Sequence, residues 1–110
     1  MQISFIGAGK VGVSLGKYFM EKGRKVGGYY SLSPESAASA AKFTNTKQYN
    51  SLEEIISSSD MIFFTVPDDC ISEVWEAAKP YAHEKIIAHC SGIHSSGIFS
   101  DIERTGSMAY

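Results

Sequence analysis

The chain has 110 residues, of which 44% are hydrophobic and 20% charged, enough for one globular domain with a buried core. Its formal net charge is −2 and its Lys and Arg residues are scattered along the sequence, so we expect no nucleic-acid-binding face. The apolar run at the start is broken by Gly7 and Gly9 after a few residues. We therefore expect no signal peptide, no membrane span and a cytosolic protein.

The first half of the chain predicts two strand–helix units. Residues 2–6 read as a short apolar strand, and after the glycines apolar residues recur at helical spacing, at Val11, Leu15, Tyr18 and Phe19. Residues 25–30 predict a second strand. Ser33 as N-cap and Pro34 at the first helical position then predict an alanine-rich helix.

The middle of the chain predicts two more strands around a short helix. Residues 46–49 indicate a short third strand, and Ser51 and Glu54 have the spacing of a capping box for the helix that follows. Residues 61–66 are apolar throughout, as expected for a parallel strand covered by helices on both faces, and Pro67 ends this strand.

A helix and two strands complete the predicted fold. Asp68 or Asp69 caps the helix, whose apolar face is formed by Ile71, Val74, Trp75 and Ala78. Residues 85–90 predict a fifth strand, residues 95–106 a short helix, and residues 107–110 the start of a sixth strand. This alternation predicts an α/β fold, with a doubly wound, mostly parallel sheet and helices on both faces, in a single domain.

The segment GAGKVG spaces three glycines as G-x-G-x-x-G between the first strand and the first helix. In that context the pattern predicts a dinucleotide-binding turn. Gly7 permits the tight turn, Gly9 leaves room for a pyrophosphate at the helix N-terminus, and Gly12 lets the helix approach the strand. The alternative is a nucleotide-free, flavodoxin-like scaffold in which the glycines serve only turn and packing.

The end of the second strand predicts NADP over NAD as the cofactor. An NAD site usually has Asp or Glu there for the ribose hydroxyls, but this strand ends in Tyr30 and Ser31. Ser31 and Ser33 precede a helix N-terminus and suit a 2′-phosphate. Leu32, where an arginine would be expected, and the nearby acid Glu35 argue the other way, so NAD stays open.

Four segments together, ISFIGAGKVGVSLG, YYSLSPESA, DMIFFTVPDDCI and HCSGIHSS, resemble a known family. They are similar to the N-terminal domain of the NADP oxidoreductases grouped with deazaflavin-dependent NADP reductases and pyrroline-carboxylate reductases. The resemblance covers nearly the whole chain. It implies a Rossmann domain that binds NADP and serves hydride transfer to or from a small-molecule substrate.

The resemblance also implies which residues bind the cofactor. The turn at Val66 and Pro67 is expected to border the ribose and nicotinamide, and the turn at Ser91 and Gly92 to lie beside the nicotinamide. With the glycine turn, the expected cofactor-binding residues are Gly7, Ala8, Gly9, Lys10, Val11, Gly12, Tyr30, Ser31, Ser33, Val66, Pro67, Ser91 and Gly92.

The family continues past the position of Tyr110 into a helical domain that shapes the substrate pocket and often the dimer. We therefore expect residues 1–110 to be the dinucleotide-binding domain and to be inactive alone. Because a cofactor domain without its substrate half could still respond to the NADPH level, a non-catalytic dinucleotide-sensing or interaction module is the alternative function.

Other reactive side chains receive weaker interpretations. His89, at the carboxyl end of the fifth strand, is the one candidate proton donor. No metal site is expected, because neighbours on a strand such as His89 and Cys90 point to opposite faces. Cys70 and Cys90 are expected to be small buried side chains rather than a disulfide framework. No acid is apparent that would orient His94 for catalysis with a nearby serine.

Overall fold

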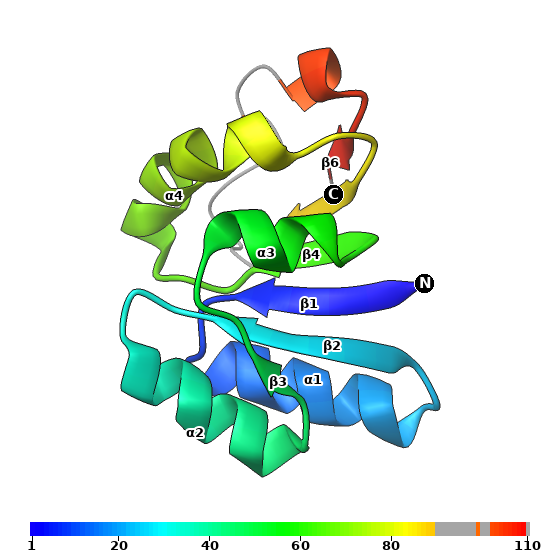
Figure 1. Ribbon diagram of the computed structural model, residues 1–110, viewed down its shortest axis with the longest axis vertical. Coiled ribbons are helices and arrows are strands. Elements are labelled where there is room, and N and C mark those ends of the chain that lie inside the picture. The colour runs from blue at the N-terminus through cyan, green and yellow to red at the C-terminus, as the bar shows by residue number, and fades with distance from the viewer. Residues whose placement is uncertain (90–98, 100–101, 110) are drawn as a thin grey trace.

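The computed structural model describes residues 1–89, 99 and 102–109, which form strands and helices in alternation (Figure 1). The strands are β1 Gln2–Ile6, β2 Lys25–Tyr30, β3 Lys47–Gln48, β4 Met61–Phe64, β5 Ile86–His89 and β6 Met108–Ala109. The α-helices are α1 Lys10–Glu21, α2 Pro34–Thr44, α3 Leu52–Ser57 and α4 Ile71–Ala78. Short 3-10 helices lie at η1 Asp68–Cys70, η2 Lys79–Tyr81 and η4 Ile102–Thr105.

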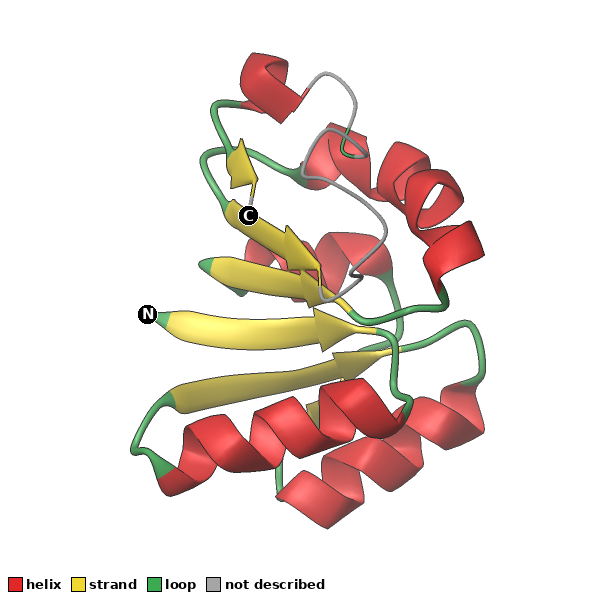
Figure 2. Cartoon of the chain, turned by 180° about the vertical axis from the view of Figure 1, so that it is seen from behind, coloured by secondary structure: helices red, strands yellow, loops and turns green. Residues whose placement is uncertain are grey.

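The strands form one six-stranded sheet in the order β3-β2-β1-β4-β5-β6. Every pairing is parallel, and Figure 2 shows the strands side by side with their arrows in one direction. The strand order therefore reverses between β1 and β4. The predicted α/β fold with a doubly wound parallel sheet is confirmed.

Two hydrophobic cores lie on the two faces of the sheet. On one face Phe5 stacks between Tyr29 and Phe63, with ring centroids 5.1 Å and 5.5 Å away, and Ala40 of α2 and Phe19 of α1 cover them. The other face is covered by α3 and α4, through Ile55, Ile56, Ile71, Trp75 and Ala78. Because neighbours on β1 point to opposite faces, Phe5 belongs to the first core and Ile6 to the second.

The predicted caps of α2 and α3 are confirmed. Ser33 is the N-cap of α2 and its side chain accepts from the Ser36 N–H, with Pro34 at the first helical position. Ser51 is the N-cap of α3, and its Oγ accepts from the Glu54 N–H at 3.1 Å. Both helices carry an acid in the first turn, which their dipoles favour.

The buried face of α1 differs from the predicted one. Val11 and Tyr18 are 51% and 53% exposed, whereas Gly12 and Gly16 are buried against the sheet. Gly12 and Gly16 lie on the contact face itself, Leu15 and Phe19 pack against the first core beside them, and Val11 and Tyr18 lie outside this face. The spacing of apolar residues therefore predicts the helix correctly. It predicts only part of the helix face that contacts the sheet.

Two local predictions after β4 are wrong. The strand ends at Phe64, and Thr65 and Val66 leave the sheet before Pro67. The N-cap of α4 is Cys70 rather than an aspartate, because the 3-10 turn η1, closed by the Cys70 N–H donating to the Pro67 carbonyl at 2.8 Å, precedes the helix. In the 95–106 segment, where a short helix was predicted, the described part contains the short 3-10 helix η4.

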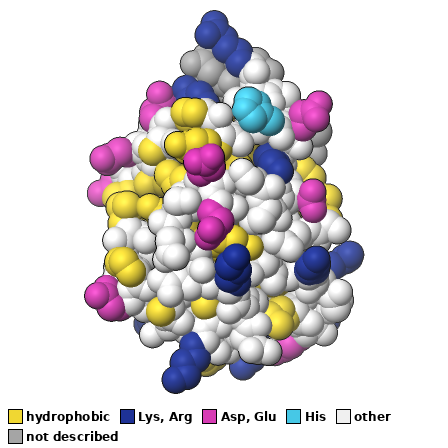
Figure 3. Space-filling model, viewed as in Figure 1, with side chains coloured by type: hydrophobic (Ala, Val, Ile, Leu, Met, Phe, Trp, Pro, Cys, Tyr) yellow, Lys and Arg dark blue, Asp and Glu magenta, His cyan; other side chains and the backbone are white. Residues whose placement is uncertain are grey.

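The expectation that Lys and Arg residues are scattered along the chain is only partly met. Seven of the ten Lys and Arg residues, but two of the twelve Asp and Glu residues, lie in residues 1–50. These residues form β1 to β3 with α1 and α2. Figure 3 accordingly shows mostly basic side chains over the lower part of this face and mostly acidic ones over the upper part. The half of the domain that carries the glycine turn is therefore cationic.

Candidate functional site

The glycine turn, residues 7–12, lies where the strand order reverses, at the carboxyl ends of β1 and β4. The Gly7 N–H donates to the Tyr30 carbonyl at 2.7 Å, and the Thr65 N–H donates to the Ile6 carbonyl at 2.8 Å. The turn is thereby fastened to the strands on both sides of β1. In open α/β sheets this crevice is the usual ligand-binding place.

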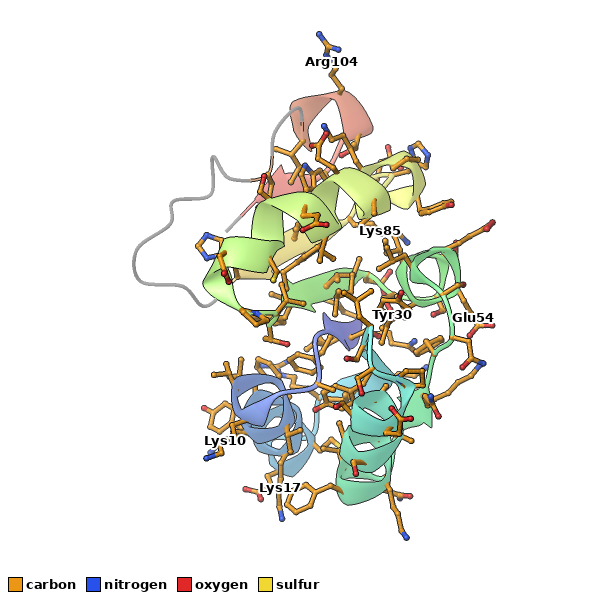
Figure 4. The ribbon with its side chains drawn as sticks, turned by 90° about the vertical axis from the view of Figure 1, so that its left-hand side faces the viewer. Lys10, Lys17, Tyr30, Glu54, Lys85 and Arg104 are labelled. Carbon is orange, nitrogen blue, oxygen red and sulfur yellow. The ribbon has the colours of Figure 1, made fainter. Side chains whose placement is uncertain are left out.

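A groove of about 480 Å³ opens over the turn, and we call it the glycine-turn groove. Figure 4 looks onto this end of the sheet, with Lys10 at the start of α1 and Tyr30 near the centre. The groove is lined by Gly7, Ala8, Gly9, Lys10, Val11, Ser31, Leu32, Ser36, Thr65, Val66, Pro67, Cys70 and Val74. Of the predicted cofactor-binding residues that are described, Gly12, Tyr30 and Ser33 are absent from this lining.

Two of the three glycines are required by the packing of the turn itself. Gly7 has φ +114°, and a Cβ there would lie 2.6 Å from the Thr65 carbonyl carbon. A Cβ at Gly12 would lie 2.7 Å from the Thr65 Oγ1 and 2.8 Å from the Gly7 carbonyl oxygen. Real Cβ atoms do not approach other atoms so closely, so both positions need glycine whether or not a ligand binds.

Gly9 differs from both neighbours in the pattern. Its backbone has φ −79° and ψ −172°, an extended conformation open to any residue, and a Cβ there would meet no protein atom within 4 Å. That missing side chain leaves space in the groove at the N-cap of α1. The fold therefore does not require a glycine at this position.

The N-terminus of α1 lacks the side-chain cap and the first-turn acid that α2 and α3 have. Its N-cap Gly9 supplies no side-chain hydrogen bond, and its first turn contains no acid. The first N–H groups of a helix have no partner within the helix, and together with the dipole they favour an anion. Lys10 is the first residue of α1, where a cation opposes the dipole, so it destabilises the helix but suits a bound anion.

A hydrogen-bonded serine cluster follows β2 at the rim of the groove. Ser31 Oγ accepts from the Ser33 N–H at 3.1 Å, and Ser36 Oγ donates to Ser33 Oγ at 3.2 Å. Ser33 Oγ in turn donates to a carboxylate oxygen of Glu35 at 3.2 Å. The cluster thus combines hydroxyl donors with one negative charge. Ser36 was missed by sequence reasoning, although its place in the first turn of α2 was visible.

The opposite wall of the groove comes from the segment after β4. This wall contains the predicted residues Val66 and Pro67. It also contains Cys70 and, one helical turn further along the chain, Val74, which were not predicted. Cys70 is half-buried at the groove rather than packed under the sheet, so the expectation of a buried cysteine is wrong. Leu32, across the groove, is 81% exposed.

Two hydroxyl groups lie beneath the turn and were not identified from the sequence. Tyr29 Oη donates to the Gly12 carbonyl at 2.7 Å, and Thr65 Oγ1 donates to the Gly7 carbonyl at 2.8 Å. Tyr29 is fully buried, and this burial, opposed by a hydrogen bond to Thr44, raises the pKa of its phenol to about 12. The phenol therefore keeps its proton, and its role as a donor, to higher pH than an ordinary tyrosine.

The remaining candidates lie away from the groove or outside the described residues. His89 ends β5 opposite Phe64, and its ring centroid lies 5.5 Å from that of Phe99 in the core under α4. Its role as a proton donor stays a prediction. Cys90, Ser91, Gly92 and His94 lie outside the described residues.

A metal cluster or a membrane-spanning helix would indicate another class of function. Within the described residues, no group of three or more His, Cys, Asp or Glu side chains gathers as a metal site would require. None of the helices in that part of the chain is both long and apolar enough to span a bilayer.

A larger hollow of about 710 Å³ runs along the outer face of α1, from Lys10 past Tyr18 to Phe43 of α2. There the Lys17 ammonium lies 4.7 Å from the centroid of the Phe43 ring. It shares Ala8, Gly9 and Lys10 with the glycine-turn groove but lies away from the strand ends. We assign the functional site to the smaller groove, because uncapped helix and strand termini converge there.

Known proteins share this fold. A family model described as a Rossmann-like domain matches residues 1–110. No curated protein matches the chain. A protein from Bacteroides fragilis named as an NADP oxidoreductase is 22% identical in sequence, with a TM-score of 0.82 over 91% of this chain and 39% of its own.

Two other solved structures extend the comparison. An imine reductase from Myxococcus stipitatus in complex with NADP+ is 17% identical, with a TM-score of 0.78 over 99% of this chain and 39% of its own. The 3-hydroxyisobutyrate dehydrogenase of Mycobacterium tuberculosis is 18% identical, with a TM-score of 0.76 over 98% of this chain and 38% of its own. At these identities the likeness establishes the fold. The chain spans about two fifths of each of these proteins.

Proposed function

Because the chain belongs to the family of Rossmann-like domains, we propose that it binds a nicotinamide dinucleotide in the glycine-turn groove, with NADP preferred over NAD. In this proposal it is the cofactor domain of an oxidoreductase with a small-molecule substrate. When bound, the nicotinamide supplies or accepts the hydride. The residues of this chain bind and orient the cofactor.

The observation that carries the proposal is the open space at Gly9. Packing explains the glycines at positions 7 and 12 without a ligand, but a side chain at position 9 would meet no protein atom within 4 Å. A pyrophosphate held close to the backbone explains why that space is kept. The free N–H groups at the start of α1 and the Lys10 ammonium are the donors that such an anion needs.

The two walls of the groove would contact the two ends of the dinucleotide. Val66 and Pro67 form one wall, and Ser31 with Ser36 the other. The exposed Leu32 side chain would be covered by a bound adenine ring, which is a favourable burial of apolar surface. His89 as proton donor and the turn at Ser91 and Gly92 beside the nicotinamide stay part of the proposal.

The preference for NADP rests on the serine cluster. The ribose end of the groove presents the hydroxyls of Ser31 and Ser36 and no acid on the strand itself. Glu35 opposes this preference, because its carboxylate accepts from Ser33 and would repel a 2′-phosphate. We expect Glu35→Gln to tighten NADPH binding about three- to tenfold and to leave NADH binding unchanged.

Isothermal titration with NADPH and NADH tests the proposal in the wild-type chain and in Gly9→Val. We expect wild type to bind NADPH more tightly than NADH and Gly9→Val to bind neither, with unchanged thermal unfolding. Ser57→Val, on the exposed end of α3, is the matched control and should bind as wild type does. Absence of binding by wild type, or normal binding by Gly9→Val, would refute the assignment of the groove.

Lys10→Ala separates ligand binding from a structural role. Removing a cation from the first turn should raise the free energy of unfolding by about 0.3–1 kcal/mol, because the dipole repulsion disappears. The same change should weaken dinucleotide binding, because it removes a positive charge from the groove. A loss of stability together with a loss of binding would mean that Lys10 supports the fold instead.

A further inference from the structure

The carbonyl groups of the glycine turn are held from below by side-chain hydroxyls on both sides. Tyr29 of β2 donates to the Gly12 carbonyl at 2.7 Å, and Thr65, directly after β4, donates to the Gly7 carbonyl at 2.8 Å. These two residues come from the strands that flank β1 on its two sides. The turn is therefore fixed at its first and last glycine by groups from different parts of the chain.

The glycines of α1 make room for these hydroxyls. A Cβ at Gly12 would lie 2.7 Å from Thr65 Oγ1, so glycine there lets the threonine reach the Gly7 carbonyl. A Cβ at Gly16 would overlap Tyr29 Oη. Gly16 lies outside the G-x-G-x-x-G pattern. A glycine is needed there because a side chain would collide with Tyr29.

A turn that binds an anion must present N–H groups to it and keep carbonyl oxygens away from it, because both the carbonyl and the phosphate oxygens are negative. We propose that Thr65 and Tyr29 are positioning residues: Thr65 holds the Gly7 carbonyl toward the sheet, and Tyr29 fixes the first turn of α1 through the Gly12 carbonyl, so that the free N–H groups at the start of α1 face the groove. This inference rests on the proposed binding of a dinucleotide. Neither residue needs to touch the ligand through its hydroxyl, since each hydroxyl is committed to a carbonyl.

Each hydroxyl can be removed by a substitution that keeps the shape of the rest of the side chain. Valine has the size of threonine without the hydroxyl, and Thr65 is half-buried in a position that accepts a β-branched residue. Phenylalanine keeps the ring of Tyr29, which stacks on Phe5 with centroids 5.1 Å apart. Thr65→Val therefore removes the bond to the Gly7 carbonyl, Tyr29→Phe removes the bond to the Gly12 carbonyl together with the Thr44 contact, and both leave the packing close to wild type.

The experiment measures NADPH affinity by titration and amide hydrogen exchange of residues 7–12 in the ligand-free chain. We expect Thr65→Val and Tyr29→Phe each to weaken NADPH binding about tenfold and to speed exchange in the turn, with exchange in α4 unchanged. Thr65→Ser keeps the hydroxyl and should keep the affinity within about twofold. Thr105→Val removes a hydroxyl that donates to the Ile102 carbonyl at 2.6 Å in η4, and Tyr49→Phe alters a buried tyrosine outside the turn; both should behave as wild type.

The outcomes separate this inference from the proposed function. If wild type binds NADPH and both hydroxyl-deleting variants bind equally well, the positioning role is overturned and the proposed function stands. If wild type binds no dinucleotide, the proposed function fails. The exchange data then decide the remaining claim, because unchanged exchange at residues 7–12 in both variants would also overturn the holding of the turn.

Discussion

Gly16→Ala should destabilise the protein, although replacing glycine within a helix ordinarily stabilises it. Gly16 lies in the middle of α1, where helix propensity alone predicts a gain of about 1 kcal/mol for alanine. The new methyl group would overlap Tyr29 Oη and lie 3.2 Å from Tyr29 Cζ and 3.4 Å from Phe5 Cε2. The tyrosine cannot yield easily, because its ring stacks on Phe5 and its hydroxyl is bonded to the Gly12 carbonyl.

The magnitude follows from three contributions. Overpacking in a close-packed core costs about 1–3 kcal/mol, and loss of the Tyr29 hydrogen bond adds about 1 kcal/mol. Helix propensity returns about 1 kcal/mol. We therefore expect the free energy of unfolding of Gly16→Ala to fall by about 1–3 kcal/mol.

A double-mutant cycle with Tyr29→Phe identifies the cause. Tyr29→Phe removes the overlapping oxygen, so Gly16→Ala in that background should lie within about 0.5 kcal/mol of neutral. The assay is urea unfolding followed by far-ultraviolet circular dichroism, with Ser14→Ala on the exposed face of α1 as the propensity control. A Gly16→Ala variant as stable as wild type, or two additive substitutions, would refute the close contact between α1 and Tyr29.

Three further predictions concern stability. Because the folded-state pKa of Tyr29 is raised to about 12 from 10.0, its contribution is present below about pH 10 and lost as pH rises toward 12. Between about pH 10 and 12, the free energy of unfolding should therefore fall by about 2–3 kcal/mol more in wild type than in Tyr29→Phe. Asp60 has its pKa lowered from 3.8 by the Gln2 N–H, with smaller contributions from the N-terminus, Lys85 and Lys25, so its contribution is present above the ordinary pKa and lost in acid. Acid titration of Asp60→Asn should accordingly show a shallower loss of stability than wild type. Ser51→Ala removes the cap of α3 and should cost about 1 kcal/mol in urea unfolding, whereas Ser57→Ala should cost nearly nothing.

The order and type of the elements could be predicted because each signal is local. The strands at residues 2–6 and 25–30 have the predicted bounds, and the caps Ser33 and Ser51 lie where the sequence placed them. Hydrophobic spacing and capping depend on neighbours within one or two turns. Local rules therefore suffice for these features.

The end of β4 depends on a contact that spacing cannot reveal. Thr65 and Val66 are β-branched residues, which strands favour, so the sequence pattern predicts a strand that continues to Val66. In the structure the Thr65 N–H makes the last bond to β1, at the Ile6 carbonyl, and its hydroxyl bonds to the Gly7 carbonyl of the turn, almost 60 residues earlier in the chain. The same nonlocal contact makes Thr65 part of the site, and this is why sequence reasoning missed it.

The three glycines of the pattern carry unequal information about function. Gly7 and Gly12 would be needed in any chain that turns from β1 into α1 against Thr65, whether or not it binds a nucleotide. Their presence is therefore compatible with the nucleotide-free scaffold that the sequence left open. Gly9 has an ordinary backbone and empty space beside it, so within the described structure packing gives no reason for a glycine at that position. Of the three glycines, Gly9 alone thus points to a ligand, and a substitution at position 9 is the change that separates binding from folding.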